Sequence, residues 1–146
     1  MRVAQGICDI VVWRFLMKCL ALLFLTVTGF AQQSKQFQTC GDKAKTQMEI
    51  NECAGDEATR TDAELNAVYR KLLAAAGSDT EAVEKIKAAE KAWLTYRDAY
   101  VEAMYPAKDK QAEYGSNYPM EVALLTAKLN GRQTLALKEL LRHYED

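Results

Sequence analysis

Apolar residues recur every three or four positions along three stretches of the chain, and this spacing places them on one side of an α-helix. The first stretch begins near Thr46 and ends at Ala76, the second ends at Tyr105-Pro106, and the third follows Pro119. No segment alternates apolar and polar residues with a period of two, as a half-buried strand would. The pattern therefore predicts an all-α fold. The three stripes are Ala54, Ala58, Thr61, Leu65, Val68, Leu72 and Ala76; Val83, Ile86, Ala89, Trp93, Tyr96, Tyr100 and Ala103; and Val122, Leu125, Leu129, Arg132, Leu135 or Ala136, and Leu140.

Local signals predict where these helices end. Gly77 follows the first stripe as a helix-ending residue, and Ser78-Asp79-Thr80-Glu81 has the S-x-x-E form of a capping box for the second helix. So short a connection makes the first two helices antiparallel neighbours. Ser116 or Asn117 caps the third helix, with Pro119 in its first turn. We expect an elongated antiparallel three-helix arrangement, with one long irregular connection at 107–119.

Residues 1–31 have the pattern of a secretory signal peptide. The uncharged run 19–30 follows Lys18 directly, and its twelve residues are too few for a membrane-spanning helix, which needs about 20. Gly29 and Ala31 occupy the −3 and −1 positions of a cleavage site before Gln32. The alternative is an uncleaved N-terminal anchor from about residue 10 to residue 31.

Upstream of this pattern, Asp9 and Arg14 interrupt the apolar run, whereas Met17-Lys18 opens an ordinary signal peptide. We therefore expect the true start at Met17 and a mature helical domain at 32–146. The mature domain carries 16 basic and 19 acidic side chains, a formal net charge of −3. This balance gives no reason to expect nucleic acid. The sequence predicts a periplasmic or secreted protein without stable membrane insertion after cleavage.

Two cysteines, Cys40 and Cys53, remain in the predicted mature domain. In an oxidising compartment two thiols at this spacing most simply form a disulfide, which stabilises the fold by about 3 kcal/mol. No C-x-x-C spacing indicates a redox enzyme, and the lone His143 offers no second histidine for zinc. We expect one structural disulfide, no metal and no cofactor.

No catalytic constellation is recognisable in the sequence. His143 lies near the C-terminus, where a solvated or helix-end histidine is the common case. Glu81, Glu84 and Glu90 share their helix with lysines at 85, 87 and 91, a pattern typical of a solvated face. We expect a binding protein and not an enzyme.

Aromatic and charged residues are densest between Trp93 and Tyr100. Trp93, Arg97 and Tyr100 share one helical face, and a guanidinium on such a face needs an acidic partner or an aromatic plane. Asp62 on the first helix is the candidate partner. One interpretation is a partner-contact surface; the favoured one is an interior network that fixes helix register. The predicted structural polar network is Asp62, Asn66, Tyr69, Trp93, Arg97 and Asp98.

A series of motifs resembles the bacterial secreted domain of the LprI type over roughly residues 40–142. The motifs are Cys40, Thr46-Gln47-Met48-Glu49-Ile50-Asn51-Glu52-Cys53, Asp62-Ala63-Glu64-Leu65-Asn66-Ala67-Val68-Tyr69, Ala92-Trp93-Leu94-Thr95-Tyr96-Arg97-Asp98, Gly115-Ser116-x-Tyr118, and Thr126 with Arg132. The resemblance implies an all-helical, disulfide-bonded secreted domain. The one named activity of this family is inhibition of lysozyme, assigned to the mycobacterial lipoprotein that names it.

The chain departs from the family pattern in two ways. Many members carry a second cysteine pair, but the matching segments 99–103 and 121–124 contain none. The connection 107–119 should therefore be more mobile, and packing alone should tie the second helix to the third. The founding member is also a lipoprotein, whereas neither Cys19 nor Cys40 has the approach expected of a lipidated cysteine.

Two functions follow as hypotheses. The first is a lysozyme inhibitor that contacts the enzyme through an exposed loop; its predicted partner-binding residues are Lys108, Lys110, Tyr114 and Tyr118. A lysine pairs there with the cleft carboxylates, and tyrosines favour interfaces. The second is a non-inhibitory helical envelope module that binds another envelope component or a small ligand.

Overall fold

The computed structural model describes residues 34–145, which form helices and short connections without a strand. Three long helices, α3 (Gln47–Ala76), α4 (Thr80–Met104) and α6 (Tyr118–Glu145), match the three predicted stretches. The all-α prediction is therefore confirmed. The shorter elements are α2 (Lys35–Gly41), α5 (Lys110–Tyr114) and the 3-10 helix η1 (Gly115–Asn117). The expected signal peptide and the start at Met17 lie outside the described residues.

The ends of α3 follow from side-chain chemistry. The Thr46 hydroxyl accepts the N–H of Glu49, and the Glu49 carboxylate accepts the N–H of Thr46, so the capping box lies here. Gly77 ends the helix at a φ of 56°, as expected. The capping box predicted at Ser78 is wrong: Asp79 caps α4 by accepting the N–H of Ala82 at 3.0 Å. Ser78 lies in the turn between the two helices, where the N–H of Asp79 donates to the carbonyl of Ala76.

Helix α2 precedes α3 and is tied to it at both ends. At its start, the Ser34 hydroxyl caps α2 and donates to Glu57 of α3 at 2.6 Å. At its end, Cys40 is bonded to Cys53 of α3, with a Cα–Cα distance of 5.7 Å, which confirms the predicted disulfide. The sequence did not predict α2, because seven residues are too few to show helical periodicity.

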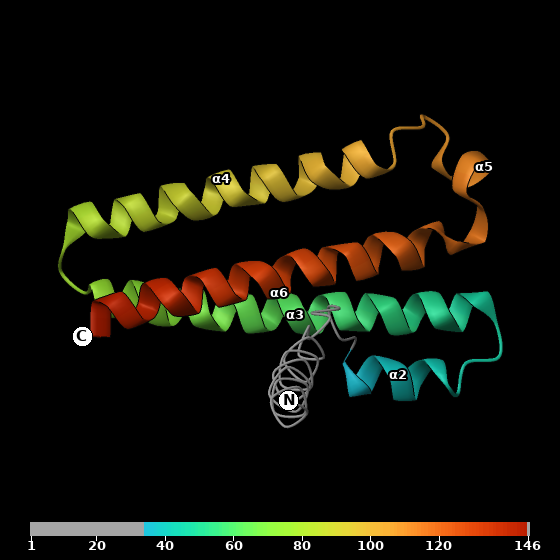
Figure 1. Cartoon of the computed structure of the whole chain (residues 1–146), viewed down its shortest axis with the longest axis horizontal. Helices are drawn as coiled ribbons and strands as arrows, with labels where there is room; N and C mark the ends of the chain where they lie inside the picture. The colour runs from blue at the N-terminus through green and yellow to red at the C-terminus, as the bar shows by residue number, and fades with distance from the viewer. Residues whose placement is uncertain (1–33, 146) are drawn as a thin grey trace, which may run out of the picture. The chain divides into compact units, whose positions relative to one another are not determined.

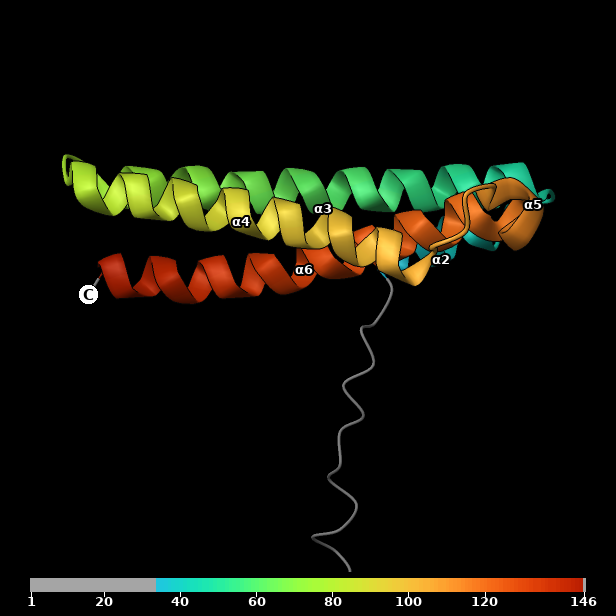
Figure 2. The same ribbon diagram turned by 90° about the horizontal axis from the view of Figure 1, so that it is seen from above.

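The long helices follow a simple path. The chain reverses between α3 and α4 and again between α4 and α6, so α4 is antiparallel to both while α3 and α6 run in the same direction (Figure 1). Helix α4 starts beside the C-terminal end of α3 and crosses toward the N-terminal end of α6 (Figure 2). The intimate pair is α3 with α6. Helices α3 and α4 are antiparallel and joined by a short turn, as predicted, but the main packing partner of α3 is α6.

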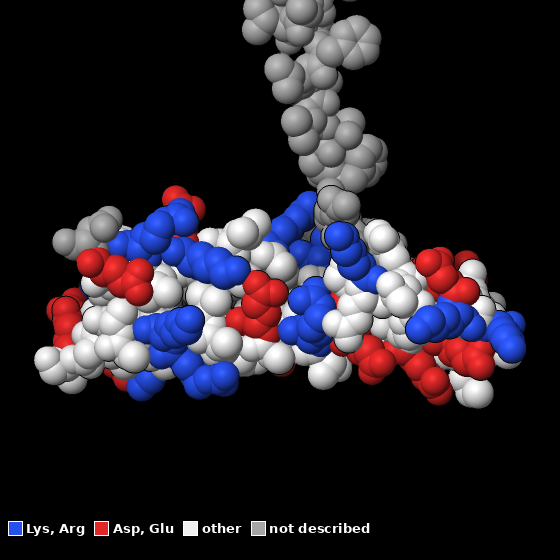
Figure 3. Space-filling view, turned by 90° about the horizontal axis from the view of Figure 1, so that it is seen from below, with Lys and Arg blue, Asp and Glu red and all other residues white. Residues whose placement is uncertain are grey.

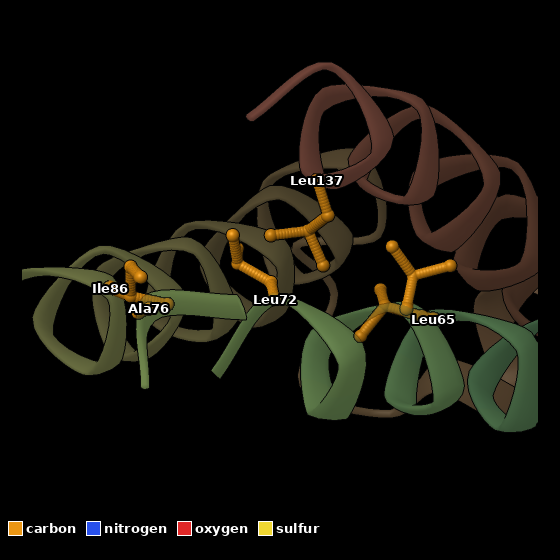
Figure 4. Packing of buried hydrophobic residues seen from close by; sticks show 6 residues of the cluster. Leu65, Leu72, Ala76, Ile86 and Leu137 are labelled. Carbon is orange, nitrogen blue, oxygen red and sulfur yellow. The ribbon is translucent and has the colours of Figure 1, made fainter. Parts of the chain in front are cut away.

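The apolar core lies where the C-terminal parts of α3 and α6 meet the N-terminal part of α4. Figure 4 shows Leu137 of α6 reaching toward Leu65 and Leu72 of α3, and Ile86 of α4 beside Ala76. The predicted stripe of α3 is buried apart from Ala58, which is half-buried beside the buried Glu57. This stripe is the part of the core that the sequence predicted best.

The predicted stripe of α4 is only partly buried. Ile86 is buried, but Ala89, Tyr96, Tyr100 and Ala103 are exposed. The second buried residue of α4 is Glu90, whose carboxylate accepts the side-chain N–H of Gln133 in α6 at 2.8 Å. The inward face of α4 therefore becomes polar one turn after Ile86. Tyr96 and Tyr100 lie on an exposed side of the helix.

Helix α6 begins with Pro119 in its first turn, as predicted. Of its expected stripe, Leu129 is buried, whereas Arg132, Leu135 and Ala136 are exposed. The centre of the α3–α6 contact is instead polar: Asn130 is 1% exposed. The side-chain N–H of Asn130 lies 3.4 Å from the Thr61 hydroxyl, and the Thr134 hydroxyl donates to the backbone carbonyl of Asn130 at 2.8 Å. Its side-chain oxygen has no partner among the described residues.

Candidate binding surfaces

The connection between α4 and α6 is built around three tyrosines. Tyr105 packs edge-on against Tyr114 and Tyr118, with ring centroids 5.2 and 5.3 Å apart, while Tyr114 and Tyr118 stack at 5.7 Å. Such geometries stabilise aromatic pairs beyond the burial of their surface. Burial, followed by the nearby carboxylate of Glu121, raises the pKa of Tyr105. Two of the three rings belong to predicted partner-binding residues, and here they bind each other.

Polar contacts also hold this connection, residues 105–118, which we call the tip. The Lys110 ammonium donates to the Glu102 carboxylate at 2.8 Å and to the carbonyl of Tyr105. The hydrogen bond with Glu102 raises the pKa of Lys110. The N–H of Ala107 donates to the Tyr114 hydroxyl at 3.2 Å. The predicted irregular connection is therefore largely two helical turns fastened to the end of α4, and Lys110 is part of the fastening.

The tip is also joined to α3, since the side-chain N–H of Asn51 donates to the carbonyl of Ser116 at 3.1 Å. Of the four residues predicted to bind a partner, Lys108 is the one that is exposed, and it has no ion-pair partner among residues 34–145. The structure thus brings Lys110, Tyr114 and Tyr118 together as a support and leaves Lys108 at the surface. The sequence missed Tyr105 and Glu102, because Tyr105 was interpreted only as the end of a helix.

The predicted polar network is divided between two helices. In α3, the side-chain N–H of Asn66 donates to the Asp62 carboxylate at 2.9 Å. In α4, Arg97 lies over the Trp93 ring at 5.4 Å and donates to its chain neighbour Asp98 at 2.9 Å. The expected contact between Asp62 and Arg97 is wrong. Asp62 pairs with Asn66, and Arg97 pairs with Asp98. Arg97 satisfies its charge locally, on the portion of α4 that has crossed away from α3.

A shallow cavity of about 250 Å³ lies between α3 and α4. Each helix contributes four residues at i, i+3, i+4 and i+7, the positions that share one face. They are Asp62, Leu65, Asn66 and Tyr69 from α3, and Lys87, Glu90, Lys91 and Leu94 from α4. Three members of the predicted network therefore line this groove, facing lysines and Glu90 instead of Arg97.

No group of three His, Cys, Asp or Glu side chains within 34–145 is placed to hold a metal ion. His143 is exposed and its ring meets the edge of Tyr144 at 5.8 Å. None of the helices in this part of the chain is long and apolar enough to cross a membrane.

One comparison with known proteins identifies a family. The family model described as lysozyme inhibitor LprI matches residues 40–137, a range that includes both bonded cysteines and the tip. The chain is also 36% identical over 136 residues to an uncharacterized protein of Rhizobium meliloti (strain 1021), with 86% of this chain and 93% of that protein covered. No solved structure matches the chain.

Proposed function

The chain belongs to the lysozyme inhibitor LprI family, as its motifs predicted, and from this premise we propose that it is an exported binding protein that inhibits a lysozyme. Export rests on the signal pattern of residues 1–31, with cleavage before Gln32. N-terminal sequencing of the exported protein tests this step. A mature protein that begins upstream of Lys18 would overturn it.

The observation that carries the proposal is the fastened tip. Tyr105, Tyr114 and Tyr118 pack together, and Lys110 bonds to the end of α4, so contacts within the chain restrain this connection. A rigid binding element loses less conformational entropy on association than a loose loop does. This support leaves Lys108 exposed at the surface.

The acidic excess in and around the tip is complementary to a basic lysozyme. Residues 98–121 carry five acidic and two basic side chains, and many lysozymes are basic. The acidic surroundings attract a basic enzyme during encounter. Lys108, the exposed base within residues 98–121, then pairs with the two cleft carboxylates on which such hydrolysis depends.

Inhibition of hen-type and goose-type lysozymes by the purified protein is the direct test. We expect Lys108→Glu to weaken inhibition at least about thirtyfold, since losing a desolvated charge pair costs about 2 kcal/mol or more. The matched control is Lys35→Glu, which reverses an exposed lysine of α2 and should leave inhibition unchanged. Absence of both binding and inhibition by the unaltered protein at micromolar concentration would overturn the proposed function. Equal effects of the two variants would overturn the role of the tip.

The groove between α3 and α4 favours a second candidate function. Its carboxylates, amide, phenol and lysines offer hydrogen bonds of both kinds around two leucines, as small-ligand sites do. In that case the protein is a non-inhibitory envelope module. Tyr69→Ala should then abolish capture of an envelope component in a pull-down, whereas Lys108→Glu should not.

A further inference from the structure

Positive charge collects on the side of the α3–α6 pair that faces away from α4. In Figure 3, which views this side, Lys and Arg predominate over its left and middle parts. Residues 128–142 of α6 contain four basic side chains and one acidic side chain, Glu139. A mature domain with a predicted net charge of −3 therefore carries a local basic face.

The bases of α6 share one side of the helix. At about 100° per residue, Lys128, Arg132, Lys138 and Arg142 fall within a sector of about 120°, opposite the buried Asn130 and Leu137. Lys138 bonds to Glu64 of α3 at 2.9 Å. The other three are exposed and have no acidic partner within residues 34–145. Their charge is therefore available to an external anion.

An apolar side chain lies in the middle of this basic sector. Leu135 is 66% exposed, the second highest value among the exposed large hydrophobic residues after Met48. A soluble polyanion offers nothing apolar for such a leucine to contact. The surface of a lipid bilayer does, because basic side chains meet headgroups there while an apolar side chain enters the acyl boundary.

We propose that this face of α6, carrying Lys128, Arg132, Leu135 and Arg142, binds the surface of an anionic lipid bilayer. Lys128 and Arg142 are about 21 Å apart along the helix, and packing on α3 keeps the face straight. Binding in this orientation turns α4 and its groove toward water. The proposal is independent of lysozyme inhibition.

Electrostatics predicts a moderate, salt-sensitive association. Lys71 of α3 lies seven residues beyond Glu64 and therefore shares its face of the helix. With Lys71 included, five bases stand against Glu64 and Glu139, an excess of three. Each such charge near an anionic surface strengthens binding by about five- to tenfold. The excess therefore gives an enhancement of about a hundredfold or more over neutral lipid, and it should decline as salt shortens the range of the interaction.

Vesicle co-sedimentation tests the proposal with the protein as the producing cells process it. Vesicles of phosphatidylcholine alone are compared with vesicles containing phosphatidylglycerol, at low and high salt. We expect binding to phosphatidylglycerol vesicles at low salt and its loss at high salt. The triple change Lys128→Gln, Arg132→Gln and Arg142→Gln should weaken this binding about a hundredfold.

The matched control neutralises Lys85, Lys87 and Lys91, three exposed lysines of α4, the helix turned toward water, and should change binding less than about threefold. Leu135→Ser, at an exposed position that tolerates the change, should weaken vesicle binding about fivefold without affecting binding to dextran sulfate. The lipid proposal is overturned by equal binding to both kinds of vesicle, by equal losses in the two triple variants, or by binding to dextran sulfate that exceeds vesicle binding and ignores Leu135.

Discussion

Helices α4 and α6 have similar lengths and both run alongside α3, but they pack on it in different ways. Helix α3 buries eight of its 30 residues and α6 buries five of 28, whereas α4 buries two of 25. The exposed apolar residues of α4 include Tyr96 and Met104, at 54% and 52%. The α3–α6 pair is therefore the body of the fold, and α4 packs on it mainly through its N-terminal half, where Ile86 and Glu90 are buried.

The difference comes from which residues stand on the inward faces. Beyond Ile86, the inward positions of α4 are Glu90, Trp93 and Arg97, which offer hydrogen bonds and cation–π contact but little aliphatic surface. The apolar rhythm that continues through Tyr96 and Tyr100 lies on a neighbouring side of the helix. An apolar stripe predicts a helix, but the stripe alone does not decide which helix will cover it.

The largest expected effect compares one leucine from each region. Leu72 of α3 is fully buried, so Leu72→Ala should lower the free energy of unfolding by about 4 kcal/mol. Leu94 of α4 is 39% exposed, and Leu94→Ala should cost less than about 1 kcal/mol. Urea denaturation of both variants measures the contrast. Similar losses in the two variants would mean that α4 is as integral to the core as α3.

The next effect concerns the covalent tie at the start of the α3–α6 body. Replacing both Cys40 and Cys53 by Ala should cost about 3 kcal/mol, because the bond closes a loop of this size in the unfolded chain. Reduction of the unaltered protein should lower its urea midpoint comparably. A variant as stable as the oxidised protein would show that α2 is held by the hydrogen bond of Ser34 with Glu57 and not by the disulfide.

A smaller effect of opposite sign is expected at the polar centre of the α3–α6 contact. Asn130 is buried, and its side-chain oxygen has no hydrogen-bond partner within residues 34–145; such a group costs about 1–3 kcal/mol. Asn130→Leu should therefore stabilise the protein by about 1 kcal/mol in urea denaturation. Asn66→Leu, on the α4 side of α3, is the control and should change stability by less than about 0.5 kcal/mol. Destabilisation by Asn130→Leu would show that the amide fixes the register of the parallel pair.

The same contrast explains how far the sequence could predict the molecule. Periodicity, Gly77 and Pro119 located the long helices, because these signals are local. The packing partner of each helix was not predictable in this way. The charge of Arg97 required an acidic partner, but the sequence did not decide between Asp62 on α3 and Asp98, which is the partner in the structure. At the tip, Lys108 and Lys110 look alike in sequence, and only the fold brings Glu102 to Lys110. The short α5 carries no periodic signal at all.

The smallest expected effect is a difference in pH dependence between α3 and α4. Glu57 is buried in α3, and its hydrogen bonds with Arg60, aided by the Ser34 hydroxyl, hold its pKa below the ordinary value of 4.5. A carboxylate with a depressed pKa stabilises the fold above its unfolded pKa, and this stability is lost as the pH falls through the folded pKa. The unaltered protein should therefore lose more stability than Glu57→Gln between about pH 5 and about pH 3.

Glu84 of α4 is the matched control for this effect, because it also pairs with a cation, Lys87 at 3.0 Å, but is exposed. Exposed pairs contribute little to stability, so Glu84→Gln should keep the pH profile of the unaltered protein in urea denaturation at a series of pH values. Parallel profiles for all three proteins would mean that the Glu57 contact is as weakly coupled to folding as a surface pair on α4. The hydrogen bond of Ser34 with Glu57 joins the start of α2 to the centre of α3. A steeper loss of stability at acid pH in the unaltered protein would show that this contact contributes to the stability of the α3–α6 pair.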